Sequence, residues 1–153
     1  MKRLLLAAAL VLAAASSAAS SAVAADKDKI HRLALQISDE SPEKMTTVLN
    51  NAANVSRYYS EKGEEVEIRI VAFNAGVNMM RTDKSPVLDR LKSVTESLPN
   101  LTLEVCGNTL DGMAHRENKQ VSDIPLYTGS RIVTAGVVEL IELNEKGYTV
   151  VRP

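Results

Sequence analysis

The residues best suited to chemistry surround a single cysteine, Cys106, in the stretch LEVCGNT. The thiolate is the nucleophilic form of cysteine, and the free N–H groups at a helix N-terminus stabilise it. Gly107 leaves room for a reactant, and Asn108 or Thr109 can cap a helical turn whose N–H groups face the sulfur. The pattern therefore indicates a reactive thiol, while simple packing, the common role of a lone free cysteine, remains the alternative.

His115 follows Cys106 by nine residues and can act as a base or an ion-pair partner for the thiol. A solvated surface histidine is the alternative. The other histidine, His31, starts a distant segment, so the sequence contains no spacing typical of a metal site. Glycine-rich phosphate-binding motifs are also missing. We therefore expect neither a metal nor a cofactor.

Residues 1–24 are typical of a secretory signal peptide, with cleavage expected after Ala24. They combine a positive start, an apolar run at 4–15 and a small-residue cleavage signature. The apolar run is shorter than the roughly 20 residues that span a bilayer. We therefore expect residues 25–153 to form a single domain that is periplasmic or secreted and not membrane-embedded.

The composition restricts the partners of this domain. Removing Lys2 and Arg3 with the leader leaves 16 basic against 19 acidic residues, a charge of −3 with neutral histidines. Basic residues are scattered and aromatic residues are few, so we expect no nucleic-acid binding. An exported chain with one cysteine cannot form an internal disulfide. The cysteine must be buried and inert, paired between chains, or used chemically.

Hydrophobic patterns predict alternating strands and helices. The Ser41-Pro42 and Ser85-Pro86 pairs are typical helix starts. Strands are expected at 31–37, 66–73, 101–105, 131–133 and 148–151, helices at about 42–63, 85–98 and 135–146, and only one or two helical turns plus a loop over 108–130. This alternation predicts an α/β three-layer sandwich: an approximately five-stranded, mostly parallel sheet with helices on both faces.

In such a sheet, ligands bind beyond the carboxyl ends of the strands. The residues expected there are Asp39, Asn74, Gly76, Cys106, Gly107, Asn108 and Thr109, together with Glu40 and the stretch 134–136. Ordinary turn residues are the alternative for all of them, and acids before a helix often serve only its dipole. Met79 and Met80 can form an apolar lip over the site, a subunit contact, or part of the core.

Four stretches give the chain a resemblance to the DsrE/DsrF-like family of sulfur-relay proteins, specifically its exported branch with a Cys-Gly-Asn-Thr stretch. They are residues 33–55, 65–80, 104–110 and 134–153. The resemblance implies a three-layer α/β fold assembled into homo- or hetero-oligomers. It also implies that a cysteine after the third strand accepts sulfur as a persulfide and passes it to a partner cysteine. Cys106 occupies that position.

Three functional hypotheses follow. The first is a periplasmic thiol-based sulfur carrier, a homo-oligomer that exchanges sulfur with a thiol- or persulfide-bearing protein partner. The second is a non-catalytic oligomeric binding module for a small anion or a partner segment, in which Cys106 only packs. The third is an intermolecular disulfide at a subunit contact.

Overall fold

The computed structural model describes residues 30–153, so the expected signal peptide at residues 1–24 lies outside the described residues. Five strands form one sheet in the order β4-β3-β2-β1-β5, and every neighbouring pair is parallel. The elements are β1 (His31–Ile37), α1 (Pro42–Glu61), β2 (Val66–Ala72), the 3-10 helix η1 (Asn74–Met80), α2 (Leu88–Ser97), β3 (Leu101–Cys106), α3 (Gly107–Glu117), the 3-10 helix η2 (Val121–Asp123), β4 (Ser130–Val133), α4 (Gly136–Glu145) and β5 (Thr149–Val151). The predicted three-layer α/β sandwich is confirmed.

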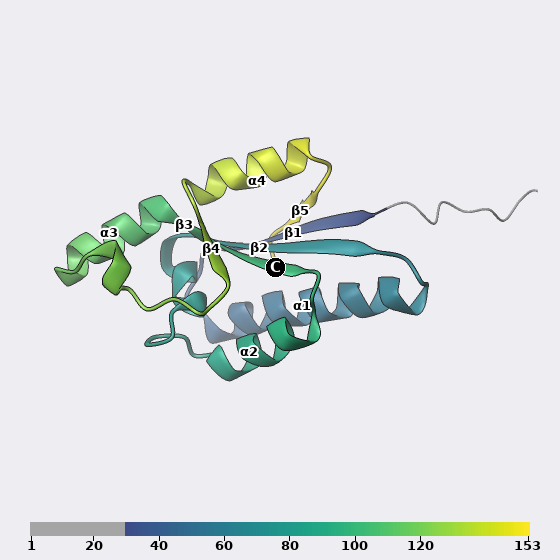
Figure 1. The fold of residues 1–153 in the computed structure, drawn as a ribbon, viewed down its shortest axis with the longest axis horizontal. Coiled ribbons are helices and arrows are strands. Elements are labelled where there is room, and N and C mark those ends of the chain that lie inside the picture. Colours follow the sequence, from purple (N-terminus) through teal and green to yellow (C-terminus); the bar gives the residue numbers. More distant parts are fainter. Residues whose placement is uncertain (1–29) are drawn as a thin grey trace, which may run out of the picture.

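Helices α1 and α2 lie on one face of the sheet (Figure 1), and the larger core fills the space between them and the strands. Alternate residues of the central strands, such as Leu35 and Ile70, point to this face, as the twofold periodicity of strands requires. They pack against α1 and α2, and α3 adds Leu110 and Met113 to the same cluster. Helices α1 and α2 therefore cover this face, whereas α3 extends beyond the strand ends and contributes its buried side chains to the same cluster (Figure 1).

Among the described residues, α4 is the helix that covers the opposite face (Figure 1). Leu140 and Leu143 of α4 pack there on Ala34 and Val71. Charged groups occupy the rest of this face, centred on Glu104, which is completely buried. The chain thus switches sides of the sheet between β3, which leads into α3, and β4, which leads into α4.

Local signals explain where the helices begin. Ser41 caps α1 by accepting a hydrogen bond from the Lys44 N–H, and Pro42 occupies the first turn, as predicted. The second serine acts differently, because Ser85 donates to the carbonyl of Met79 at 2.7 Å. It accepts from the Val87 N–H, and α2 begins only at Leu88.

One sequence-based expectation is corrected, and one set of alternatives is decided. The segment 108–130 was expected to hold one or two helical turns, but α3 runs for 11 residues until Asn118 ends it in the left-handed conformation, with φ of 52°. Met79 and Met80 are fully buried in the larger core. The short 3-10 helix η1 turns them inward, so the core role is confirmed among the three alternatives for these methionines.

Residues 30–153 include no helix with the length and apolar character needed to cross a membrane.

Candidate functional site

An open pocket of about 690 Å³ lies at the carboxyl ends of the strands. Because the chain leaves β3 toward one face and β4 toward the other, a crevice opens between these neighbouring strands, where doubly wound sheets bind ligands. The lining residues come from all four exit loops and from α3: Glu40, Phe73, Asn74, Ala75, Asn78, Cys106, Asn108, Thr109, Gly112, Met113, Arg116, Ala135, Gly136 and Val137.

Cys106 lies where the two sides of this crevice meet. It is the last residue of β3 and the N-cap of α3, and it is only 6% exposed. The first residue of α4, Gly136, lies beside it: a Cβ built on Gly136 would lie 3.3 Å from the Cβ of Cys106. The sulfur is therefore bounded by the N-termini of two helices, and both helix dipoles favour a negative charge there.

These surroundings lower the pKa of Cys106 below its ordinary value. Burial alone raises the pKa, because it removes water from the thiolate. That effect is outweighed by the Thr109 hydroxyl and then by the backbone N–H groups of Gly136, Thr109 and Asn108. The site therefore favours the thiolate, the form that attacks sulfur.

Thr109 links the thiol to the loop after β2. Its Oγ1 accepts a hydrogen bond from the backbone N–H of Asn74 at 3.0 Å, so its own proton is available to Cys106. Asn74 adopts a left-handed conformation, with φ of 49°, which asparagine tolerates better than most residues. Asn108 contributes less, because its backbone N–H donates to the carbonyl of Thr134 at 3.2 Å.

Charged side chains fasten α4 to the sheet close to the thiol. Glu104 lies two residues before Cys106, so both side chains point to the face that α4 covers. Its carboxylate accepts hydrogen bonds from Arg69 and Arg131, and Arg131 also reaches Glu139 in the first turn of α4. The ion pairs hold the α4 N-terminus in the register that puts Gly136 beside Cys106.

Seven of the residues expected at the strand ends line the pocket: Glu40, Asn74, Cys106, Asn108, Thr109, Ala135 and Gly136. Gly107 and Gly76 have packing positions instead. A Cβ on Gly107 would lie 3.1 Å from the carbonyl oxygen of Val133, and one on Gly76 would lie 2.3 Å from that of Ile37. Both glycines let neighbouring backbones approach closely.

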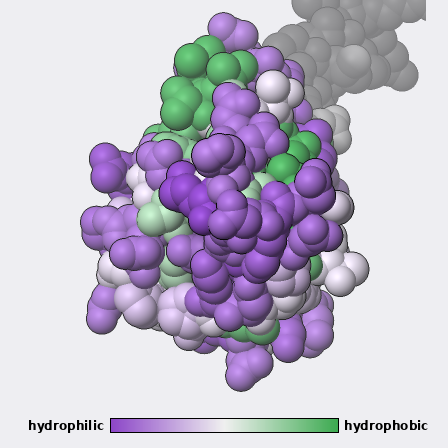
Figure 2. All heavy atoms as spheres, turned by 90° about the vertical axis from the view of Figure 1, so that its left-hand side faces the viewer, coloured by the Kyte–Doolittle hydropathy of each residue, from purple (hydrophilic) through white to green (hydrophobic). Residues whose placement is uncertain are grey.

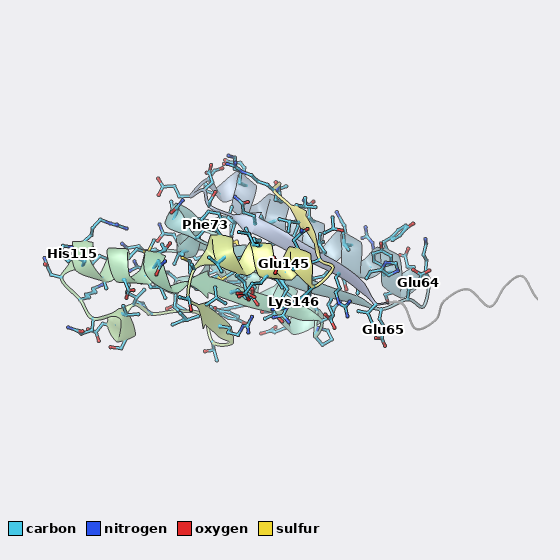
Figure 3. All side chains as sticks on the ribbon, turned by 90° about the horizontal axis from the view of Figure 1, so that it is seen from above. Glu64, Glu65, Phe73, His115, Glu145 and Lys146 are labelled. Carbon is cyan, nitrogen blue, oxygen red and sulfur yellow. The ribbon has the colours of Figure 1, made fainter. Side chains whose placement is uncertain are left out.

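The structure does not bring Asp39 or His115 into the pocket lining. Asp39 accepts from the Ser41 N–H and pairs with Lys44 at 2.6 Å, and Lys44 holds the pKa of its carboxyl below the usual value. His115 is exposed in the last turn of α3, about 12 Å along the helix from its start. Figure 3 shows it at the tip of the molecule, far from Phe73 of the pocket.

Sequence reasoning did not select Phe73, Asn78, Met113 or Arg116, which all line the pocket. These residues could have been selected only if the full length of α3 had been predicted from the sequence. Once the helix is known to run past residue 115, positions 109, 112, 113 and 116 share one face at helical spacing. Gly136 was among the expected strand-end residues, but its role as an N–H donor to the thiol depends on where α4 begins.

Within residues 30–153, no three histidine, cysteine, aspartate or glutamate side chains are grouped as metal ligands would be. The polar groups of the pocket lining are the thiol of Cys106, the carboxylate of Glu40, the guanidinium of Arg116, three asparagine amides and the hydroxyl of Thr109. The chemistry this lining supports is nucleophilic attack by a thiolate or binding of a small molecule.

An apolar surface adjoins the pocket. Val137, Val138 and Ile141 on α4 are each at least half exposed. Figure 2 shows apolar side chains gathered at the top of the molecule, over this helix. Val137 also lines the pocket, so the apolar surface of α4 continues to the thiol site.

Fold and site together define a parallel α/β sandwich with a thiol at its strand-end crevice. Solved structures with this fold include a protein of unknown function from Methanobacterium thermoautotrophicum, with 24% identity and a TM-score of 0.66. The ychN protein of E. coli, of the DsrE/DsrF-like fold, has 17% identity and a TM-score of 0.60. Each similarity covers 80% of this chain and 99% of the other. No family model and no curated protein sequence matches the chain.

Proposed function

We propose that this protein is a thiol-based sulfur carrier that holds sulfur as a persulfide on Cys106. The observation that carries the proposal is the position of this thiol, with a lowered pKa, in an open pocket between the N-termini of α3 and α4. A persulfide is itself an anion, so the N–H groups that favour the thiolate also favour the loaded form. The DsrE/DsrF-like resemblance and fold supply the expected cargo.

Two features bear on where the proposed carrier acts and how it assembles: residues 1–24 and the exposed apolar side chains of α4. We propose that residues 1–24 direct it to the periplasm or the outside of the cell. The exposed apolar side chains of α4 support assembly into a homo-oligomer, since apolar patches often mark contacts. A protein partner with its own thiol or persulfide would then receive the sulfur.

A binding module with an unreactive cysteine is the second candidate, favoured by the low exposure of Cys106. The low exposure of Cys106 also argues against an intermolecular disulfide. Two such sulfurs would have to approach to about 2.05 Å, which requires both pockets to open.

The test is intact-mass analysis of residues 25–153 after incubation with polysulfide, beside the Cys106→Ser variant. A gain of sulfur atoms in the native protein that is absent from the variant is expected, and dithiothreitol should remove it. The carrier is refuted if no sulfur is added while a small alkylating reagent still labels Cys106. Slow alkylation as well would favour the packing role, and a dimer on a non-reducing gel would indicate the disulfide.

A further inference from the structure

We infer that the Cys106 pocket selects anionic reactants and that Arg116 is the residue that recognises them. The inference deepens the proposed function, on which it rests for the identity of the cargo. It assigns the sulfur donor to a chemical class: small sulfane anions, of which thiosulfate is the simplest stable example.

The guanidinium of Arg116 is directed toward the thiol pocket by the shape of α3. Arg116 lines the pocket, although it lies in the last turn of a helix that starts at Cys106. Its side chain folds back one turn over Gly112, where a Cβ would lie 3.3 Å from Nη1. A glycine inside a helix costs about 1 kcal/mol relative to alanine. At position 112 the absence of a side chain leaves space for the guanidinium of Arg116 to lie against the helix.

Arg116 has no carboxylate partner within residues 30–153, unlike the other cations near the end of α3. The adjacent Glu117 instead accepts from Arg81 at 2.5 Å, from Lys84 at 2.7 Å and from Lys119 at 3.0 Å. An unpaired guanidinium presents a planar set of donors suited to the oxygens of a sulfur oxyanion. The charge of Arg116 is therefore free for a ligand.

The rest of the lining restricts which groups the pocket favours. Asn74, Asn78 and Asn108 add amide side chains, whereas Glu40 adds the one carboxylate. Glu40 opposes anion entry and Arg116 favours it. Removing the charge of Arg116 should therefore reduce the preference for anions, and removing the charge of Glu40 should increase it. A merely structural role of either residue would not produce this opposition.

The reaction with such a donor is balanced within the pocket. The Cys106 thiolate attacks the outer sulfur of thiosulfate, and a new sulfur–sulfur bond forms with the electron pair of the thiolate. The original bond breaks, and its electron pair leaves with sulfite. The products are a persulfide anion on Cys106 and one sulfite dianion. Arg116 would hold the sulfonate oxygens during attack and stabilise the leaving charge.

Two alkylating reagents that differ in charge test the inference without requiring a sulfur donor. The Cys106 thiolate attacks the carbon of both iodoacetate and iodoacetamide and displaces iodide, so the ratio of the two second-order rate constants reports anion selection independently of thiol pKa. Arg116→Gln should lower this ratio about tenfold at low ionic strength, and Arg116→Lys should recover much of it. Glu40→Gln should raise the ratio, and added salt should diminish every difference.

Further variants separate recognition from stability. Gly112→Ala asks Nη1 of Arg116 to shift by only a few tenths of an ångström, so it should keep the ratio close to the native value while strengthening the helix, visible as an unchanged or higher urea midpoint. Arg57→Gln, on the exposed surface of α1, serves as the matched control for loss of one positive charge. A ratio that is the same in the native protein and in Arg116→Gln would overturn the inference.

Experiments that load sulfur onto Cys106 then test whether anion selection by Arg116 determines which sulfur donor the protein uses. Thiosulfate should load the native protein faster than Arg116→Gln by about the same factor. A neutral organic trisulfide should load both equally, because attack of the thiolate on its central sulfur forms a new sulfur–sulfur bond on Cys106 and releases an organic thiolate without any anion entering the pocket. If the trisulfide loads the native protein but thiosulfate does not, the assignment of anionic donors fails and the carrier stands. If neither donor loads it, the carrier fails, and the alkylation ratio alone decides whether Arg116 selects anions.

Discussion

The backbone N–H of Asn74 donates a hydrogen bond to Oγ1 of Thr109 at 3.0 Å. This contact joins the loop after β2 to the first turn of α3, across 35 residues of sequence. It also leaves the Thr109 hydroxyl proton to stabilise the Cys106 thiolate. Hydrogen bonds in series polarise one another, so the Asn74 contact strengthens the bond to sulfur.

We predict that Thr109→Val slows alkylation of Cys106 by iodoacetamide about tenfold at neutral pH, because one hydrogen bond to a charged sulfur is lost. Valine has nearly the same shape as threonine, and water can reach the N–H of the exposed Asn74. Thr109→Ser is the matched control, since it retains the hydroxyl and should react at nearly the native rate. Equal rates for the valine and serine variants would contradict the role assigned to the hydroxyl.

A second prediction separates packing from binding in the loop after β2. Gly76→Ala should lower the free energy of unfolding by about 3 kcal/mol or prevent folding, because its Cβ would lie 2.3 Å from the carbonyl oxygen of Ile37. Ala75→Ser changes the neighbouring residue, which lines the pocket, and should leave stability nearly unchanged. Urea denaturation measures both variants. A stable Gly76→Ala protein with altered reactivity would instead favour a binding role for Gly76.

The general position of the site could be predicted from sequence because it depends on a rule of parallel sheets. Once the stretches ending at Ile37, Ala72, Cys106 and Val133 are recognised as successive strands, their exit loops must meet at one edge. The hydrophobic patterns were strong enough to identify all five strands. The sequence therefore places Cys106 at this edge of the sheet.

The details of the pocket depended on α3, whose extent the sequence obscures. The sequence predicts one or two helical turns plus a loop over 108–130, and Gly112 weakens the helical pattern of Leu110, Met113 and Ala114. A loop can fold back over the site, which made His115 a natural candidate. A straight helix instead carries His115 outward and places Arg116 four residues after Gly112 on the same face, a spacing that matters only once the segment is recognised as one helix.

A third prediction concerns the apolar surface of α4. Ile141 is 55% exposed, although helices of a monomeric protein usually present polar side chains to water. We expect Ile141→Glu to dissociate the proposed oligomer into smaller species, measured by size-exclusion chromatography with light scattering. Glu142→Gln, on the same helix, is the control and should keep the native size. A native protein that is monomeric throughout the concentration range would contradict the assembly.

The final prediction is a pH dependence of stability that originates at Cys106. Burial raises the pKa of this thiol, but the Thr109 hydroxyl and the Gly136 N–H outweigh it, so the folded pKa lies below the unfolded one. A group of this kind stabilises the fold fully above its unfolded pKa, about 8.5 for cysteine. The stabilisation is lost as pH falls through the folded pKa.

The free energy of unfolding of the native protein, minus that of Cys106→Ser, should therefore rise with pH up to about 9 and then level off. Urea titrations at closely spaced pH values, under reducing conditions, measure this difference. The same comparison in a Thr109→Val background should give a smaller rise, because the largest stabilising contact of the thiolate is gone. A difference that falls with rising pH would mean that burial dominates and that Cys106 is a packing residue.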